Sequence, residues 1–195
     1  MDQRQDVEVV AALAAILDEL GIEYAVGGSM ASSVYGKARF TQDADITVEP
    51  FESKAEVFFN AVRALFYISR EAMFDALRQR GSFNLIHLER ALKIDIFVRK
   101  DTDFEKQLLP RRRFLELAEG MEKKLAVVSA EDIVLLKLQW YRQGGCVSES
   151  QWKDVLGVMK VQRSKLDYAY IKKWAKIIGI NDLVERALVE AENYA

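Results

Sequence analysis

The sequence contains very little cysteine, histidine and proline. One cysteine, Cys146, and one histidine, His87, occur among 195 residues, together with two prolines. A single cysteine excludes an intramolecular disulfide, and it favours a reducing, cytoplasmic environment. One histidine and one cysteine also argue against a zinc site. His87 stands in a strand-like run, and we interpret it as a structural residue.

The sequence also lacks a long apolar segment and a large excess of either charge. No window approaches the roughly 18 uncharged apolar residues of a membrane span, so we expect no membrane association. The chain has 28 basic and 30 acidic residues, which gives a formal net charge of −2. This balance excludes a generally basic surface for nucleic acid. Binding of RNA would need a local basic patch, for which residues 111–113 are the best candidate.

What is present is a regular alternation of strand and helix signals. Half of the residues are hydrophobic and 30% are charged, as in a globular domain with a core. We predict an α+β fold, in which a mixed β-sheet flanked by helices occupies residues 1–128. A C-terminal helical region, residues 129–195, should pack on that core. Hydrophobic spacing predicts strands over 22–26, 43–48, 82–88, 91–98, 112–117 and 123–127, and helices over 5–20, 30–35, 54–65, 71–80, 130–142, 149–162, 167–178 and 181–193.

A glycine turn, Gly27-Gly28-Ser29, joins the first strand to a short helix. Glycines allow the backbone to approach a phosphate closely, and a helix N-terminus offers free N–H groups. The Ser29 hydroxyl adds one more donor. Considered alone, a Gly-Gly sequence after a strand is more often a tight turn that binds no ligand.

Three aspartates follow in strand-like segments. Asp43 and Asp45 are two residues apart, so their carboxylates share one face of a strand. Asp95 stands between two isoleucines in a later strand, where burial would be costly unless the carboxylate is paired or bound to a metal. We predict that the three form a divalent-metal site. The alternative is a set of solvent-exposed strand residues.

These motifs resemble those of the nucleotidyltransferase superfamily that includes DNA polymerase beta. The glycine turn, the Asp-x-Asp pair and the third acid in KIDIF carry the resemblance, which covers about residues 7–160. The arrangement Arg39-x-Thr41-x-Asp43-x-Asp45 is most similar to bacterial minimal nucleotidyltransferases and to the AbiEii/AbiGii abortive-infection toxin group.

The resemblance implies transfer of a nucleoside monophosphate from an NTP, such as ATP, to an acceptor. It assigns Asp43 and Asp45 to Mg²⁺, or to Mn²⁺ in its place, and Asp95 to the metal on the acceptor side. Asp95 would also help to deprotonate the nucleophile. The same resemblance implies nucleotide contacts for Gly27, Gly28, Ser29, Arg39, Thr41, Lys137, Lys153 and Asp154.

Several alternatives stay open at this stage. Lys137, Lys153 and Asp154 also fit an ordinary pair of amphipathic helices. The acceptor could be RNA or tRNA, a protein, or a small molecule such as an aminoglycoside. A role in a toxin–antitoxin or phage-defence system would add an antitoxin partner. A binding module that keeps the fold but performs no turnover is the alternative from a different functional class.

Overall fold

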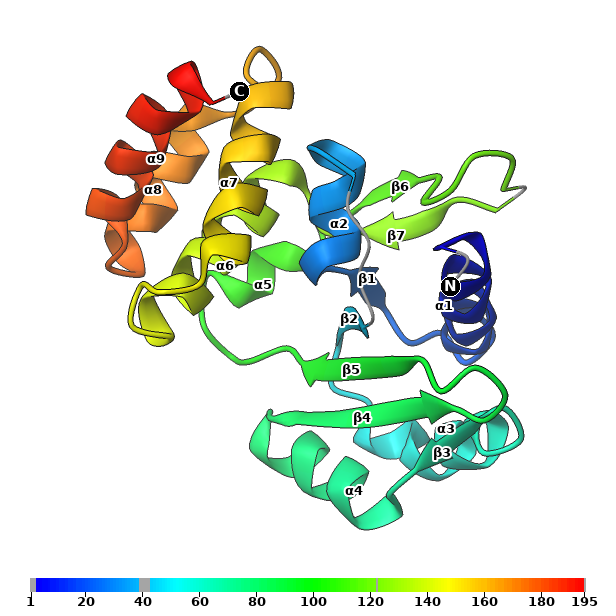
Figure 1. Cartoon of the computed structure of the whole chain (residues 1–195). Helices are drawn as coiled ribbons and strands as arrows, with labels where there is room; N and C mark the ends of the chain where they lie inside the picture. Colours follow the sequence, from blue (N-terminus) through cyan, green and yellow to red (C-terminus); the bar gives the residue numbers. More distant parts are fainter. Residues whose placement is uncertain (1–2, 39–42, 122, 195) are drawn as a thin grey trace. The chain divides into compact units, whose positions relative to one another are not determined.

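The computed structural model of the chain describes residues 3–38, 43–121 and 123–194 (Figure 1). Two compact units are present. The first comprises Met1–Gly27 and Phe40–Val127, and the second comprises Gly28–Arg39 and Val128–Ala195. The helix that follows the glycine turn therefore belongs with the C-terminal helices. The division predicted from the sequence, at residue 128, groups this helix with the sheet.

The seven strands found in the described residues all belong to the first unit and form one mixed sheet, in the order β3-β4-β5-β2-β1-β7-β6. The β2–β5 and β1–β7 pairs are parallel, and the other neighbours are antiparallel. The predicted α+β class with a mixed sheet is confirmed. The strands are β1 (Tyr24–Val26), β2 (Asp43–Val48), β3 (Phe66–Ile68), β4 (Ser82–His87), β5 (Lys93–Val98), β6 (Arg113–Leu115) and β7 (Leu125–Val127).

Buried and more exposed residues alternate along strands β2 to β5, so this part of the sheet has one buried face. Ala44, Ile46 and Val48 are buried, whereas the residues between them are exposed or half-buried. Helix α3 (Ala55–Val62) covers the buried face, since Phe58 meets Phe83 of β4 with ring centroids 6.4 Å apart. The other face carries the polar residues of the same strands. This two-sided pattern is typical of a sheet with helices on one side.

The helices of the first unit agree with the predicted ranges except near residue 60. The helix predicted over 54–65 is shorter in the structure. A 3-10 turn (Glu52–Lys54) precedes α3, which ends at Val62, and strand β3 follows. Strand β3 was not predicted, because its three residues are too few to show the alternation that identifies a strand in a sequence. Helices α1 (Gln3–Glu19), α4 (Arg70–Gln79) and α5 (Glu105–Leu108) complete the unit. No helix in the described part of the chain is both long and apolar enough to cross a membrane.

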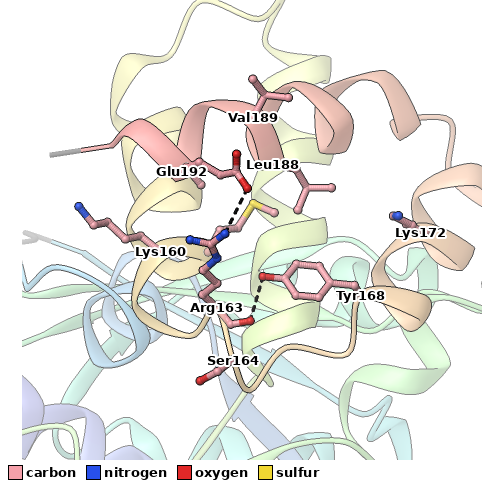
Figure 2. Close-up of a pocket in the computed structure, with 10 residues that line it drawn as sticks. Lys160, Arg163, Ser164, Tyr168, Lys172, Leu188, Val189 and Glu192 are labelled. Carbon is pink, nitrogen blue, oxygen red and sulfur yellow. Dashed lines mark hydrogen bonds and ion pairs between the residues drawn. The ribbon is translucent and has the colours of Figure 1, made fainter.

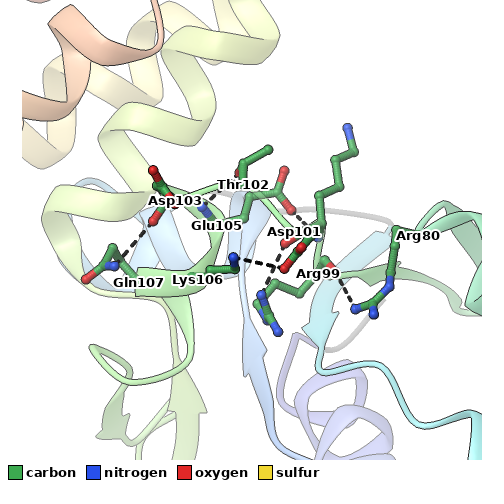
Figure 3. Close-up of polar contacts among 9 residues, drawn as sticks. Arg80, Arg99, Asp101, Thr102, Asp103, Glu105, Lys106 and Gln107 are labelled. Atoms are coloured by element: carbon green, nitrogen blue, oxygen red, sulfur yellow. Dashed lines mark hydrogen bonds and ion pairs between the residues drawn. The ribbon is translucent and has the colours of Figure 1, made fainter.

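A polar loop connects β5 to α5 (Figure 3). Thr102 Oγ1 accepts a hydrogen bond from the Glu105 N–H at 3.2 Å, and the Glu105 carboxylate accepts one from the Lys100 N–H at 2.7 Å. Lys106 pairs with Asp101 at 3.0 Å, and this hydrogen bond holds the pKa of Asp101 below its ordinary value. The side chains in this loop therefore satisfy one another and fix the exit of the chain from β5.

Among the residues that the structure describes, the regular elements of the second unit are helices. Helix α2 (Gly28–Tyr35) packs against α6 (Ala130–Gln143) and α7 (Glu149–Val161), which α8 (Tyr168–Ile177) and α9 (Asn181–Asn193) follow. Ser129 caps α6 by accepting a hydrogen bond from the Asp132 N–H at 3.2 Å. Gly36 lies so close to α7 that an added Cβ would be 2.8 Å from the Val158 nitrogen. Glycine is therefore required for this close approach.

A buried ion pair joins α6 to α7. Lys137 Nζ lies 2.8 Å from Asp154 Oδ2, and their side chains are 1% and 5% exposed. The same ammonium donates a hydrogen bond to Gln151 Oε1 at 3.0 Å. A charge in such an environment is stable only while its partner is present.

We expect Lys137→Met to destabilise the protein by about 3 to 5 kcal/mol, because it leaves the Asp154 carboxylate buried without its cation. The measurement is the urea dependence of helical circular dichroism. The double variant Lys137→Met, Asp154→Leu removes both charges and should recover most of the lost stability. Equal stability of the single variant and wild type would contradict the importance of the pair.

Candidate functional site

The three predicted aspartates lie on two neighbouring strands of the first unit. β2 and β5 pair in parallel with Asp45 opposite Asp95 and Asp43 opposite Lys93. These four positions alternate with buried residues on both strands, so their side chains share the polar face of the sheet. The structure therefore brings Asp43, Asp45 and Asp95 to one face of the sheet, called the acidic face below.

Asp95 has two side-chain partners in this arrangement. Lys93 Nζ lies 2.8 Å from Asp95 Oδ2, and Asn84 Nδ2 of the neighbouring strand β4 donates to Asp95 Oδ1 at 3.1 Å. The Asp95 side chain is mostly buried, whereas Lys93 is about half exposed. An amide and an ammonium together fix the orientation of this carboxylate.

The electrostatic character of the face is visible at Lys93. Its hydrogen bond to Asp95 raises the pKa of the Lys93 ammonium above the ordinary value and outweighs desolvation, which lowers that pKa. The negative charges of Asp95, Asp43 and Asp45 raise it further. Three carboxylates thus act on one cation, so this face attracts positive charge.

The acidic face carries carboxylate oxygens, which suit a hard divalent cation, but the described residues do not already form a complete coordination site. Carboxylate oxygens are the ligands that Mg²⁺ prefers. Across residues 3–38, 43–121 and 123–194, no three acidic, histidine or cysteine side chains are already grouped to hold a metal ion. Asp95 is instead bonded to Lys93. A metal ion at Asp95 would compete with Lys93 for that carboxylate.

The glycine turn begins directly beside the acidic face. The Gly27 N–H donates a hydrogen bond to the Asp45 carbonyl oxygen at 2.8 Å, which places Gly27 at the end of β1 next to Asp45. Gly28 has φ +54 and is the first residue of α2. A positive φ is easy for glycine and costly for other residues. Ser29 is the second residue of α2.

The remaining predicted nucleotide contacts belong to different environments. Lys137 and Asp154 form the buried pair of the second unit, and Lys153 is exposed and bonded to Glu149 at 3.0 Å. The nucleotide contacts predicted for these three residues stay predictions. Arg39 and Thr41 lie outside the described residues.

Two polar residues of the acidic face, Lys93 and Asn84, were not predicted from the sequence. Lys93 could have been found there, since it precedes Asp95 by two residues in the same strand and must share its face. Asn84 could not, because only the register of β4 against β5 places it opposite Asp95.

The second unit contains a separate pocket of about 690 Å³ between α7, α8 and α9 (Figure 2). Leu188 and Val189 line it, together with the cationic residues Lys160, Arg163 and Lys172. Arg163 is bonded to Glu192 at 3.2 Å, and its carbonyl accepts a hydrogen bond from the Tyr168 hydroxyl at 3.0 Å. None of the predicted site residues that the structure describes lines this pocket.

Comparison with known proteins gives similarity at the level of structure. No family model and no curated protein matches the sequence. An antigenic nucleotidyltransferase-like protein from Paracoccidioides brasiliensis has a TM-score of 0.56 and 17% identity, covering 96% of this chain and 94% of that one. A candidate nucleotidyltransferase from Thermotoga maritima has a TM-score of 0.52 and 16% identity, covering 78% and 94%. The antibiotic-resistance factor ANT(2'')-Ia has a TM-score of 0.51 and 13% identity, covering 100% and 97%.

These similarities extend over nearly the full length of each of the three known structures. Identities of 13–17% support a conclusion about the fold only. The chain has the fold of the nucleotidyltransferase superfamily.

Proposed function

We propose that the protein is a Mg²⁺-dependent nucleotidyltransferase that moves a nucleoside monophosphate from an NTP to a hydroxyl-bearing acceptor. The observation that carries this proposal is the β2–β5 register, which sets Asp45 opposite Asp95 on the face that also bears Asp43. The superfamily fold supports the same activity. The single cysteine is consistent with action in the cytoplasm.

The reaction forms one bond and breaks another at the α-phosphorus of the NTP. The acceptor oxygen attacks this phosphorus, and the bond from phosphorus to the bridging oxygen of the β-phosphate breaks. Pyrophosphate leaves with the electron pair. The proton of the acceptor hydroxyl passes to Asp95, from which solvent removes it. Asn84 orients Asp95 for this step through its hydrogen bond to Oδ1.

Asp43, Asp45 and Asp95 would hold the magnesium. When bound, the metal supplies positive charge that neutralises the phosphates and lowers the pKa of the attacking hydroxyl. The effect of the carboxylates on Lys93 supports this assignment, since the same face already stabilises a cation. We assign Gly27, Gly28 and Ser29 to the NTP phosphates because glycine backbone and free helix N–H groups suit anions.

The finer assignments are also proposals. The toxin-like role with an antitoxin partner rests on the motif Arg39-x-Thr41-x-Asp43-x-Asp45 alone. RNA, protein and small-molecule acceptors are all compatible with the same three acids, because the acids act on the phosphate and the acceptor hydroxyl alone.

A second candidate function is nucleotide or partner binding without turnover. The specific observation in its favour is the ion pair between Lys93 and Asp95, which occupies the carboxylate that would accept the proton. A binding module would retain this pair in the presence of an NTP and metal. An enzyme would break it.

We expect Asp45→Asn to reduce label transfer from [α-³²P]NTPs by at least about a hundred-fold, because removal of a metal ligand should cost more than loss of an outer-shell partner. The assay uses each NTP with Mg²⁺ and a cell extract that supplies acceptors. The control is Asp103→Asn, an exposed aspartate in the loop after β5. Transfer that is unchanged in Asp45→Asn would remove the acidic face from the mechanism, and NTP binding without any transfer would favour the binding module.

We expect Lys93→Met to tighten Mn²⁺ binding by about ten-fold, because the substitution removes an ammonium that competes with the metal ion for the carboxylates. Loss of the free Mn²⁺ signal in electron paramagnetic resonance measures the affinity without turnover. Lys106→Met is a matched control, since Lys106 has similar exposure and forms an ion pair with Asp101 in the same unit. Unchanged or weaker binding in Lys93→Met would show that the face is not a metal site.

A further inference from the structure

The pocket of about 690 Å³ in the second unit is built from neighbouring positions on α8 and α9 and from the end of α7. Tyr168 and Lys172 are four residues apart on α8, so they share one side of that helix. Leu188 and Glu192 have the same spacing on α9. Small-molecule sites in proteins enclose roughly 300 to 1,000 Å³. The helical unit therefore has room for a small ligand.

Apolar side chains form much of the wall of this pocket. Met159 is buried, and Leu188 and Ala191 are half-buried. Tyr168 adds an aromatic ring, whose hydroxyl donates a hydrogen bond to the Arg163 carbonyl oxygen at 3.0 Å. Burial raises the pKa of the Tyr168 phenol above its ordinary value, although Arg163 lowers it. The polar end of Tyr168 is thus satisfied within the protein, and its ring is what a ligand would meet.

The charged residues of the pocket are mostly basic. Among the described residues that line it, Lys160, Arg163 and Lys172 are cationic and Glu192 is acidic. Glu192 is paired with Arg163 at 3.2 Å, and Lys160 donates a hydrogen bond to the carbonyl oxygen of Tyr194, which is a neutral acceptor. Lys172 forms no hydrogen bond or ion pair with another residue that the structure describes. Its ammonium is therefore available to an anion.

The position of Lys172 relative to the ring fixes how a ligand can use both. Side chains four residues apart on a helix have Cβ atoms about 5 to 6 Å apart. Figure 2 shows the Tyr168 ring between Arg163 and Lys172. A ring that packs against Tyr168 can consequently carry an anionic group to the Lys172 ammonium.

The two kinds of lining restrict the chemistry of the ligand. An apolar ring would remove the carbons of Met159, Leu188 and Tyr168 from water, which is favourable. A sugar or the polar edge of a nucleobase would lose hydrogen bonds to water against the same carbons. An anionic group, in contrast, gains a charge-assisted hydrogen bond from Lys172.

We propose that this pocket binds a small molecule that combines an apolar ring system with a single anionic group. The ring lies against Tyr168 and Leu188, and the anionic group pairs with Lys172. The site is contained in the second unit. The proposal does not depend on the proposed transferase function.

The test compares 1-naphthaleneacetate with 1-naphthaleneacetamide, which has the same ring and linker but no charge. Equilibrium dialysis against the full chain, without nucleotide, measures the affinity of each. We expect the carboxylate to bind at least about five-fold more tightly than the amide, because only the carboxylate pairs with the ammonium. Lys172→Met should abolish this preference, whereas Lys172→Arg should preserve it. Tyr168→Ala should weaken binding of both compounds.

Lys176→Met is the matched control, since Lys176 is an exposed lysine of the same helix that does not line the pocket. It should leave both affinities unchanged. Circular dichroism verifies that each variant keeps its helices. Equal binding of the two compounds to the wild type, or a preference that survives Lys172→Met, would overturn the site.

AMP tests the apolar part of the proposal, because it joins an anionic group to a ring with polar edges. We expect AMP to compete weakly for bound 1-naphthaleneacetate. Displacement by AMP at lower concentrations than unlabelled 1-naphthaleneacetate requires, lost in Lys172→Met, would show a nucleotide site and overturn the proposed ligand class.

Discussion

Parallel pairing of β2 with β5 is the constraint on which the acidic face depends. Six consecutive residue pairs, from Asp43–Lys93 to Val48–Val98, hold the two strands in register. A slip of one residue would turn one strand over and bury its carboxylates. Burial of Ile46 and Ile94 on the other face opposes such a slip. The hydrophobic core therefore positions Asp43, Asp45 and Asp95, although none of these three belongs to the core.

The two units stabilise charged side chains in different ways. In the helical unit, Lys137 and Asp154 are paired one to one and removed from water, which holds α6 and α7 in a single arrangement. On the sheet, Asp43, Asp45 and Asp95 all raise the pKa of the Lys93 ammonium, which stays about half exposed. The first arrangement suits a structural brace. The second holds a cation at a surface that solvent reaches.

Much of the fold could be predicted from the sequence because most elements have clear periodicity. Strands 43–48 and 93–98 alternate cleanly, and Ser129 precedes its helix as a cap should. Register could not be predicted, because a shift of two residues would keep every side chain on the same face while setting Asp45 opposite Lys93. For the same reason Asn84 was missed. Strand β3 escaped detection because only its pairing with β4 defines it.

The assignment of α2 to the helical unit has a consequence for dividing the chain. Met30, Ala31 and Tyr35 of α2 are buried, and the helix packs on α6 and α7 although nearly a hundred residues of sequence separate them. A fragment that begins at residue 128 would lack this helix and would expose the apolar sides of α6 and α7 that it covers. A fragment that stops at residue 127 would leave α2 with no surface to bury its own. Autonomous expression of the helical unit therefore requires a rearranged gene in which residues 28–38 are joined to the C-terminal helices.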